Sequence, residues 1–264
     1  MTFSKIDGIN LYYDDYGQKG QVPFIFIHGW ISSSEFWRNQ VEKLKDKRRI
    51  IVLDLRGHGQ SDKPHEEYSI KKFSEDLKSF MDKLGVVKAI LVGHSMGGMI
   101  ALQFTLDHQE KVEKLILIDT LAKSSFSIRR KMLFIISQMA FSIAYESFMR
   151  YYLKRIYQKN YPKVILEKTL EKVLKNPKYV VKSCYSAIKT FDVSQELASI
   201  TVPTCIIQGR ESFIPLSQAK YFEKKILNTY LMIIEGAGHA TPRENPKKVN
   251  EAIEKFIQME KGRR

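Results

Sequence analysis

The chain has 264 residues, which suits one large α/β domain or a core domain that carries an inserted cap. Its hydrophobic content of 44% is that of an ordinary globular protein, and its two cysteines, Cys184 and Cys205, are too far apart in sequence to indicate a disulfide framework or a zinc site. The net charge of +14 is unusual, and most of it falls between residues 121 and 200. We expect a cytoplasmic protein with no metal site.

Buried-strand and helix patterns alternate along the first 120 residues. The opening stretch, 3–16, is typical of a hairpin, because Asp7-Gly8 favours a type I′ turn and apolar residues alternate after it. Further strands are expected at 24–27, 50–53, 90–94 and 114–119, with helices at 35–45, at 69–84 and after residue 95. This alternation predicts parallel βαβ units with right-handed crossovers, preceded by an antiparallel hairpin.

The stretch Gly93-His94-Ser95-Met96-Gly97 changes periodicity at its centre, from a buried strand to a helix. The pattern G-x-S-x-G at such a junction is that of a nucleophile elbow, in which the two glycines permit a strained turn that projects the serine hydroxyl. A helix that begins there also points backbone N–H groups at an oxyanion. Ser95 is therefore a candidate nucleophile.

Residues 121–200 show no buried strand, and their pattern indicates several helices rich in aromatic residues. The longest apolar stretch of the chain, 132–144, lies here, but polar residues interrupt it and it is too short to span a bilayer. The strand pattern returns at 204–208 and at 230–234, and Pro246 begins a final amphipathic helix. Helices inserted between two strands of a parallel sheet predict a cap over the edge at which the serine lies.

Four motifs follow one another in a fixed order: His28-Gly29-Trp30, the segment 54–62 (DLRGHGQSD), the segment 93–98 (GHSMGG) and the segment 236–239 (GAGH). Together they resemble the α/β-hydrolase family, in its branch of capped serine hydrolases that includes carboxylesterases and lipases. The resemblance implies a mostly parallel central sheet with an antiparallel N-terminal hairpin and an inserted helical cap. The core domain would comprise residues 1–120 and 201–264, and the cap residues 121–200.

The same resemblance assigns roles to individual residues. Ser95 corresponds to the nucleophile and His239 to the general base that takes its proton. The oxyanion hole corresponds to the backbone N–H groups of Trp30 and Met96. No cofactor and no metal are implied.

The triad acid departs from the family pattern, because the loop Gly209-Arg210-Glu211-Ser212-Phe213-Ile214-Pro215 is one residue shorter than usual. Alignment from the glycine places Ser212 at the acid position, and alignment from the proline places Glu211 there. We favour Glu211, whose longer side chain can compensate for the short loop. Asp119, at the end of the preceding strand, is the alternative, and a dyad without an acid is a third interpretation.

The candidate serine limits the reactions that are expected. Relatives with an aspartate nucleophile open epoxides or remove halides through an ester, whereas a serine would form an inert ether there. Ser95 suits acyl transfer, so we expect hydrolysis of short to medium carboxylic esters through an acyl-enzyme. A perhydrolase, a lactonase or a C–C hydrolase on the same triad is the alternative, and a catalytically slow ligand-binding protein is the alternative of another class.

Residues 121–200 contain 15 Lys and Arg against 5 Asp and Glu. We interpret the excess first as the solvated side of amphipathic helices, since the lysines recur at helical spacing. Contact with an anionic membrane surface is a less favoured hypothesis, and nucleic-acid binding is not expected because no motif supports it. The expected partner is a small-molecule ester substrate, and the sequence does not indicate the oligomeric state.

Overall fold

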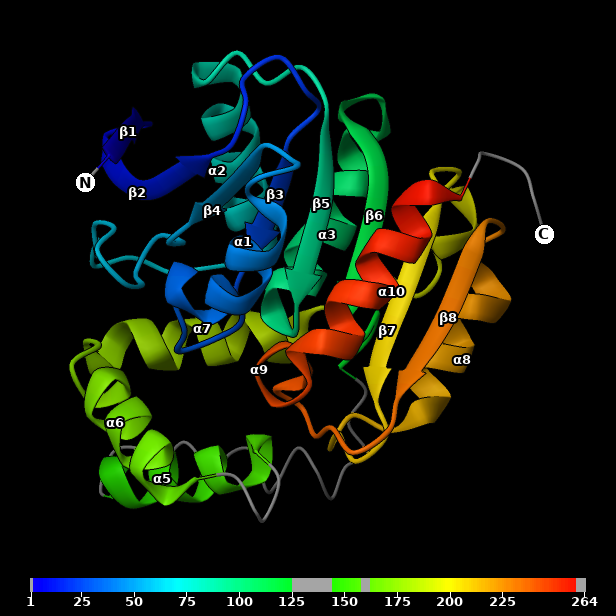
Figure 1. The fold of residues 1–264 in the computed structure, drawn as a ribbon. Coiled ribbons are helices and arrows are strands. Elements are labelled where there is room, and N and C mark those ends of the chain that lie inside the picture. The colour runs from blue at the N-terminus through cyan, green and yellow to red at the C-terminus, as the bar shows by residue number, and fades with distance from the viewer. Residues whose placement is uncertain (1, 125–143, 158–161, 260–264) are drawn as a thin grey trace.

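The computed structural model describes residues 2–124, 144–157 and 162–259, and its centre is an eight-stranded sheet (Figure 1). The strands in chain order are β1 Thr2–Ile6, β2 Ile9–Tyr16, β3 Phe24–Ile27, β4 Ile50–Leu53, β5 Ala89–His94, β6 Val112–Ile118, β7 Thr204–Gly209 and β8 Thr229–Ile234. In space their order is β1-β2-β4-β3-β5-β6-β7-β8. Strand β2 pairs antiparallel with β1 and β4, and the other pairs are parallel. The predicted α/β-hydrolase architecture is confirmed.

Helices cover both faces of the sheet (Figure 1). Those on one face are α2 Ile70–Lys83, α3 Met96–Asp107 and α8 Leu216–Lys225, and those on the other are α1 Arg38–Leu44 and α10 Pro246–Gln258. Strand β3 contributes to both cores, because Ile25 and Ile27 pack with the first set of helices and Phe24 and Phe26 with the second. A strand that is buried on both faces has a continuous apolar sequence, as β3 does.

Between β6 and β7, the described part of the chain forms three α-helices: α5 Tyr145–Ile156, α6 Lys163–Leu174 and α7 Lys178–Thr190. We call them the cap helices. Figure 1 shows them beyond the carboxyl ends of the parallel strands. The division into a core of residues 1–120 and 201–264 and a cap of residues 121–200 stays a prediction, because 125–143 and 158–161 lie outside the described residues.

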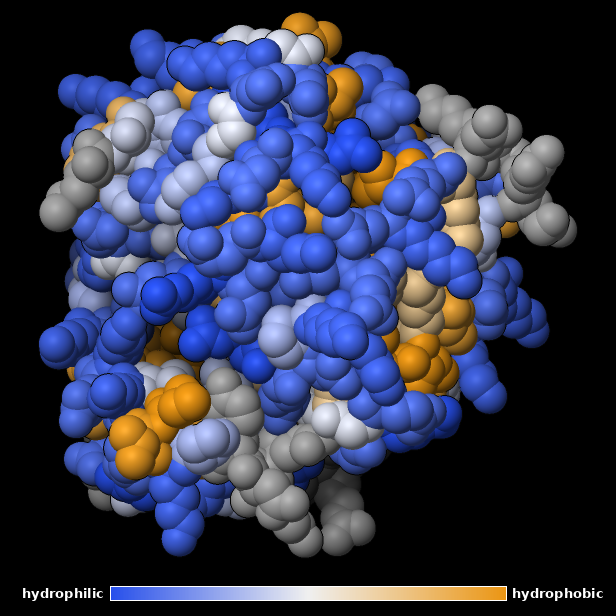
Figure 2. Space-filling view, viewed as in Figure 1, coloured by the Kyte–Doolittle hydropathy of each residue, from blue (hydrophilic) through white to orange (hydrophobic). Residues whose placement is uncertain are grey.

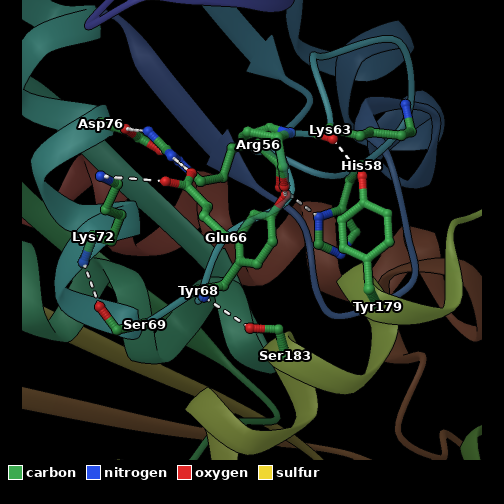
Figure 3. A network of polar contacts seen from close by, with 11 residues as sticks. Arg56, His58, Lys63, Glu66, Tyr68, Ser69, Lys72, Asp76, Tyr179 and Ser183 are labelled. Carbon is green, nitrogen blue, oxygen red and sulfur yellow. Dashed lines mark hydrogen bonds and ion pairs between the residues drawn. The ribbon is translucent and has the colours of Figure 1, made fainter.

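Helix α7 is hydrogen-bonded to the loop that follows β4. The Tyr68 amide donates to Ser183 Oγ (2.8 Å), and the Tyr179 hydroxyl donates to the Lys63 carbonyl (Figure 3). Figure 3 also shows the buried Arg56, whose guanidinium bonds both Asp76 of α2 and Glu66 of the loop. The hydrogen bonds of Tyr68 and Tyr179 thus fix α7 to the core, and those of Arg56 hold the core loop on α2.

Several element boundaries differ from the sequence-based expectation. The helix expected at 35–45 begins as a 3-10 helix, Ser34–Trp37, because the buried Asp54 carboxylate accepts the Ser34 amide (2.6 Å) there. The strand expected at 114–119 runs from Val112 to Ile118 and leaves Asp119 outside it. The elements that the sequence did not predict are α8, α9 Thr241–Glu244 and the 3-10 helices Gln109–Lys111 and Leu197–Ser199. Among the described residues, no helix is both long and apolar enough to cross a membrane, and residues 132–143 of the apolar stretch 132–144 lie outside them.

Candidate active site

Ser95 lies in the sharp turn between β5 and α3. Its φ of +53° and ψ of −117° are strained values for a residue with a side chain. The turn has no space for side chains beside it: a Cβ on Gly93 would lie 2.3 Å from the Gly97 carbonyl oxygen, and a Cβ on Gly97 would lie 2.1 Å from that of Ile27. The Ser95 amide donates to the Ile118 carbonyl (2.9 Å) and so fixes the turn to β6. The strand-turn-helix junction therefore has the form that the glycine spacing predicts.

His239 follows β8, and its Nε2 lies 3.0 Å from Ser95 Oγ. Its backbone is fixed at both ends, because its N–H donates to the Ile156 carbonyl of α5 (3.0 Å) and its carbonyl oxygen lies 2.7 Å from His94 Nε2. The residue is buried, and this burial, together with the neighbouring His94, lowers the pKa of His239 well below its usual range. The imidazole is thus neutral near pH 7 and able to accept a proton from Ser95.

The other ring nitrogen, His239 Nδ1, lies 3.2 Å from Ser212 Oγ. Asp119 lies close to His239 and is the first residue after β6. It is 1% exposed and has a positive φ of +46°. One carboxylate oxygen, Oδ1, accepts the Gly209 amide and the Gln208 side-chain amide, both at 3.0 Å. The other, Oδ2, has no hydrogen-bond partner among the described residues. A buried carboxylate oxygen without a partner is costly, so its retention here favours a chemical role.

Burial raises the pKa of Asp119 to about 7, although the polar groups of Thr241, Gly209 and Ser212 act in the opposite direction. The carboxyl group is therefore divided between its two protonation states near neutral pH. This is the range in which a group can respond to proton transfer at a neighbouring imidazole.

Glu211 lies on the exposed side of the same loop, and its backbone N–H donates to the Ala237 carbonyl (3.0 Å). Ser212, one residue later, has its hydroxyl within hydrogen-bond distance of His239 Nδ1. Alignment of this loop from the glycine places Ser212 at the acid position, and alignment from the proline places Glu211 there. The sequence does not predict the contact of Ser212 with the imidazole, because a hydroxyl at an acid position gives no signal of a triad partner.

His94, Asp119 and His239 are the one group of metal-ligand type among the described residues whose candidate ligand atoms all lie within 4.8 Å of one another. Both nitrogens of His239 already face hydroxyl groups, at 3.0 and 3.2 Å. The cluster therefore fits a hydrogen-bonded acid–base arrangement better than a metal centre.

A cavity of about 50 Å³ lies over Ser95 and is also lined by His239, Gly29 and Trp30. Met96 is the first residue of α3, so its N–H is one of those that have no partner inside the helix. The loop at Trp30 is supported from below by His28, whose Nδ1 lies 2.7 Å from the Gly29 carbonyl. The structure thus places both predicted oxyanion residues beside the serine.

Aromatic side chains surround the cavity. The Trp30 indole donates to the Val181 carbonyl of α7 (3.0 Å) and packs on Tyr152 and Tyr185, with ring centroids 4.9 and 5.1 Å away. Phe213 packs on the imidazole of His239 at 4.2 Å. These rings give the surroundings of the Ser95–His239 pair an apolar character.

Comparison with known proteins places this geometry in a family. The family model described as the α/β hydrolase fold matches residues 22–158. The AB hydrolase superfamily protein YisY of Bacillus subtilis is 30% identical over 94% of this chain and 95% of its own length. An esterase from Thermogutta terrifontis is 27% identical, with a TM-score of 0.86 over 97% of this chain and 96% of its own. Epoxide hydrolase 4 of Mus musculus is 36% identical over 44% of this chain and 33% of its own length.

The match extends over more than half of the chain, the sheet has the order and directions described above, and the serine lies at the junction of β5 and α3. The chain belongs to the α/β-hydrolase family, and it is a hydrolase.

Proposed function

We propose that the protein is a serine hydrolase of carboxylic esters, in which Ser95 is the nucleophile and His239 the general base. The observation that carries the proposal is the distance of 3.0 Å between Ser95 Oγ and His239 Nε2, at a serine held in a strained backbone conformation. A serine hydroxyl is a weak nucleophile near pH 7, and a neutral imidazole at this distance can remove its proton during attack.

The reaction then follows from the geometry. Ser95 Oγ attacks the ester carbonyl while its proton moves to His239 Nε2, and the resulting oxyanion faces the N–H groups of Met96 and Trp30. When the tetrahedral intermediate collapses, the imidazolium returns the proton to the leaving alcohol. Water, activated by the same imidazole, cleaves the acyl-enzyme and restores Ser95.

Asp119 is the carboxylate that we assign to this imidazole, in place of the Glu211 that the loop sequence favoured. Asp119 is buried beside His239, whereas Glu211 lies on the exposed side of its loop. Ser212 interacts with both groups, because its hydroxyl lies 3.2 Å from Nδ1 and acts to lower the pKa of Asp119. Ionised Asp119 would stabilise the imidazolium that forms during attack, and Ser212 would orient the ring.

Other reactions of the family are less well supported. Opening of an epoxide by Ser95 would leave an ether that water does not cleave, so the similarity to an epoxide hydrolase does not carry that activity here. Lactone opening, perhydrolysis and C–C cleavage use the same serine chemistry and remain alternatives within the class. The free, buried thiols of Cys184 and Cys205 are compatible with the reducing cytoplasm that we propose as the location.

A catalytically slow ligand-binding protein is the second candidate, and the observation that favours it is the raised pKa of Asp119, which leaves part of the population without an ionised acid at pH 7. A panel of 4-nitrophenyl esters from acetate to octanoate, assayed at pH 8 with wild type and Ser95→Ala, distinguishes the two. Ester hydrolysis that requires Ser95, together with labelling of Ser95 by an alkyl fluorophosphonate in mass spectrometry, supports the enzyme. Equal, background-level rates and no labelling would favour the binding protein.

A further inference from the structure

A groove of about 520 Å³ runs between α6 and the loops of the core, next to the cavity over Ser95. The two spaces have five lining residues in common: Ile31, Ser32, Phe36, Tyr157 and Thr169. Figure 2 shows a hollow between the cap helices and the core, with hydrophobic atoms at its bottom and hydrophilic atoms around it. The groove is therefore an extension of the candidate active site.

Helix α6 lines this groove with both basic and apolar residues. Lys168, Lys172 and Lys175 line it, at spacings of four and three residues that place them on one side of the helix. Val173 of the same helix also lines the groove and is buried. An amphipathic helix normally turns its apolar residues inward and its lysines to solvent. Helix α6 follows this pattern, because Leu170 and Val173 are buried and the three lysines are exposed, and these lysines line the open space that leads to Ser95.

The charge of the groove is positive. Its lining has five basic residues, Lys63, Lys168, Lys172, Lys175 and Arg243, and two acidic ones, Glu35 and Asp54. Glu35 pairs with Lys172. Lys168 and Lys175 make no ion pair within the described part of the chain, so their ammonium groups are available to an anion.

We propose that this groove binds the anionic end of the ester substrate, a carboxylate or a phosphate, while the ester carbonyl lies at Ser95. The inference rests on the proposed ester hydrolysis and specifies its substrate class. Ile31, Phe36 and Val173 provide buried apolar surface along the groove for the carbon chain between the two ends. Lys168 and Lys175 provide the cations, which a concave site brings closer to a small anion than a flat basic surface would.

The test compares esters that differ only in charge. One pair carries the anion on the acyl side, mono-4-nitrophenyl suberate against its methyl ester. The other carries it on the alcohol side, 4-(butanoyloxy)benzoate against its methyl ester. Wild type should prefer the anionic member of at least one pair by about fivefold in kcat/KM, mainly through KM, and the preference should decline as salt screens the lysines.

Lys168→Gln/Lys175→Gln should reduce this preference to near one, without changing the rate on the methyl ester by more than about twofold. Lys163→Gln/Lys182→Gln is the matched control, because it removes the same charge from cap lysines that do not line the groove. Equal kcat/KM for charged and neutral members of both pairs in wild type, or an equal loss of preference in the two double variants, would overturn the inference.

Binding to Ser95→Ala, measured by calorimetry with the same esters, keeps the inference separate from the proposed function. Tighter binding of a charged member, weakened by Lys168→Gln/Lys175→Gln, supports the groove site even if wild type hydrolyses none of the esters. Hydrolysis of neutral esters without any such difference in binding retains the esterase and overturns the groove site. Sedimentation with phosphatidylglycerol vesicles that requires Lys168 and Lys175, combined with no preference among the soluble esters, would assign these lysines to a lipid surface and also overturn it.

Discussion

The two ring nitrogens of His239 face regions of the molecule that are built in different ways. On the Nε2 side, Ser95 is positioned by one turn of six residues, 93–98, whose shape is imposed by close backbone contacts of its glycines. On the Nδ1 side, Ser212 and Asp119 come from the loops after two different strands, β7 and β6. The Ser95 side is thus a local structure, whereas the side of Ser212 and Asp119 depends on how the ends of separate strands meet.

Removal of the imidazole disrupts both sides and has the largest expected effect. His239→Ala should lower kcat on 4-nitrophenyl butanoate by roughly 10⁵- to 10⁶-fold, because the nucleophile loses its base and the imidazolium can no longer form. The far-ultraviolet circular dichroism spectrum should remain that of wild type. A loss of less than about a hundredfold in a folded variant would mean that another group activates Ser95.

Two carboxamide variants compare the candidate acids. Asp119→Asn should lower kcat by about 10⁴-fold, because the imidazolium loses its buried carboxylate. Glu211→Gln should change kcat by less than twofold, since its side chain is exposed. The reverse ranking in steady-state assays at pH 8 would assign the acid to Glu211, and no loss in either variant would indicate a dyad.

Ser212 tests the link between Asp119 and the ring. Ser212→Ala should lower kcat by roughly tenfold, the usual effect of one hydrogen bond, and leave KM for a neutral ester unchanged. Ser212→Asp in the Asp119→Asn background should recover part of the lost rate, because it places a carboxylate at the position where the family usually has one. If the double variant is as slow as Asp119→Asn, Ser212 does not occupy that position.

The smallest expected effect is on stability. The pKa of Asp119 is about 7 in the folded protein and about 3.8 in the unfolded chain, so between these values the folded state holds a proton that the unfolded state releases. Stability attributable to this group is therefore lost as the pH rises from about 4 to about 7. Asp119→Asn removes that loss and should raise the melting temperature at pH 8 by several degrees, at ~2–4 °C per kcal/mol. A lower melting temperature in calorimetry would mean that the ionised carboxylate stabilises the fold.

Most of the fold could be predicted from the sequence, because its signals are local. The buried strand 24–27, the Asp7-Gly8 turn and the glycines around Ser95 each determine a short structure through periodicity or steric limits. The position of His239 beside Ser95 could be predicted as well, since it follows the last strand in a short glycine-flanked segment. The fold and the position of His239 could both be inferred from the four motifs and their order along the chain.

The sequence could not decide between Glu211 and Asp119 as the carboxylate for His239, because the choice depends on distances between strand ends that no local pattern encodes. The loop 209–215 is one residue short, and its sequence favoured Glu211, whose side chain lies on the outer side of the loop. The lysines of α6 are a second example. Their spacing predicted that they share one face, but whether that face meets solvent or a groove depends on how the helix packs on the core.

The most direct test of the account is the pH dependence of kcat/KM in wild type, Asp119→Asn and Glu211→Gln. The pKa of His239 is well below its usual range and that of Asp119 is about 7, so the base is already neutral when the acid ionises. In wild type and Glu211→Gln, kcat/KM should rise as the pH increases through about 7 and then level off. In Asp119→Asn the residual rate should be nearly constant from pH 6 to pH 8. A rise near pH 7 that persists unchanged in Asp119→Asn, or disappears in Glu211→Gln, would contradict the assignment of Asp119 as the carboxylate that supports His239.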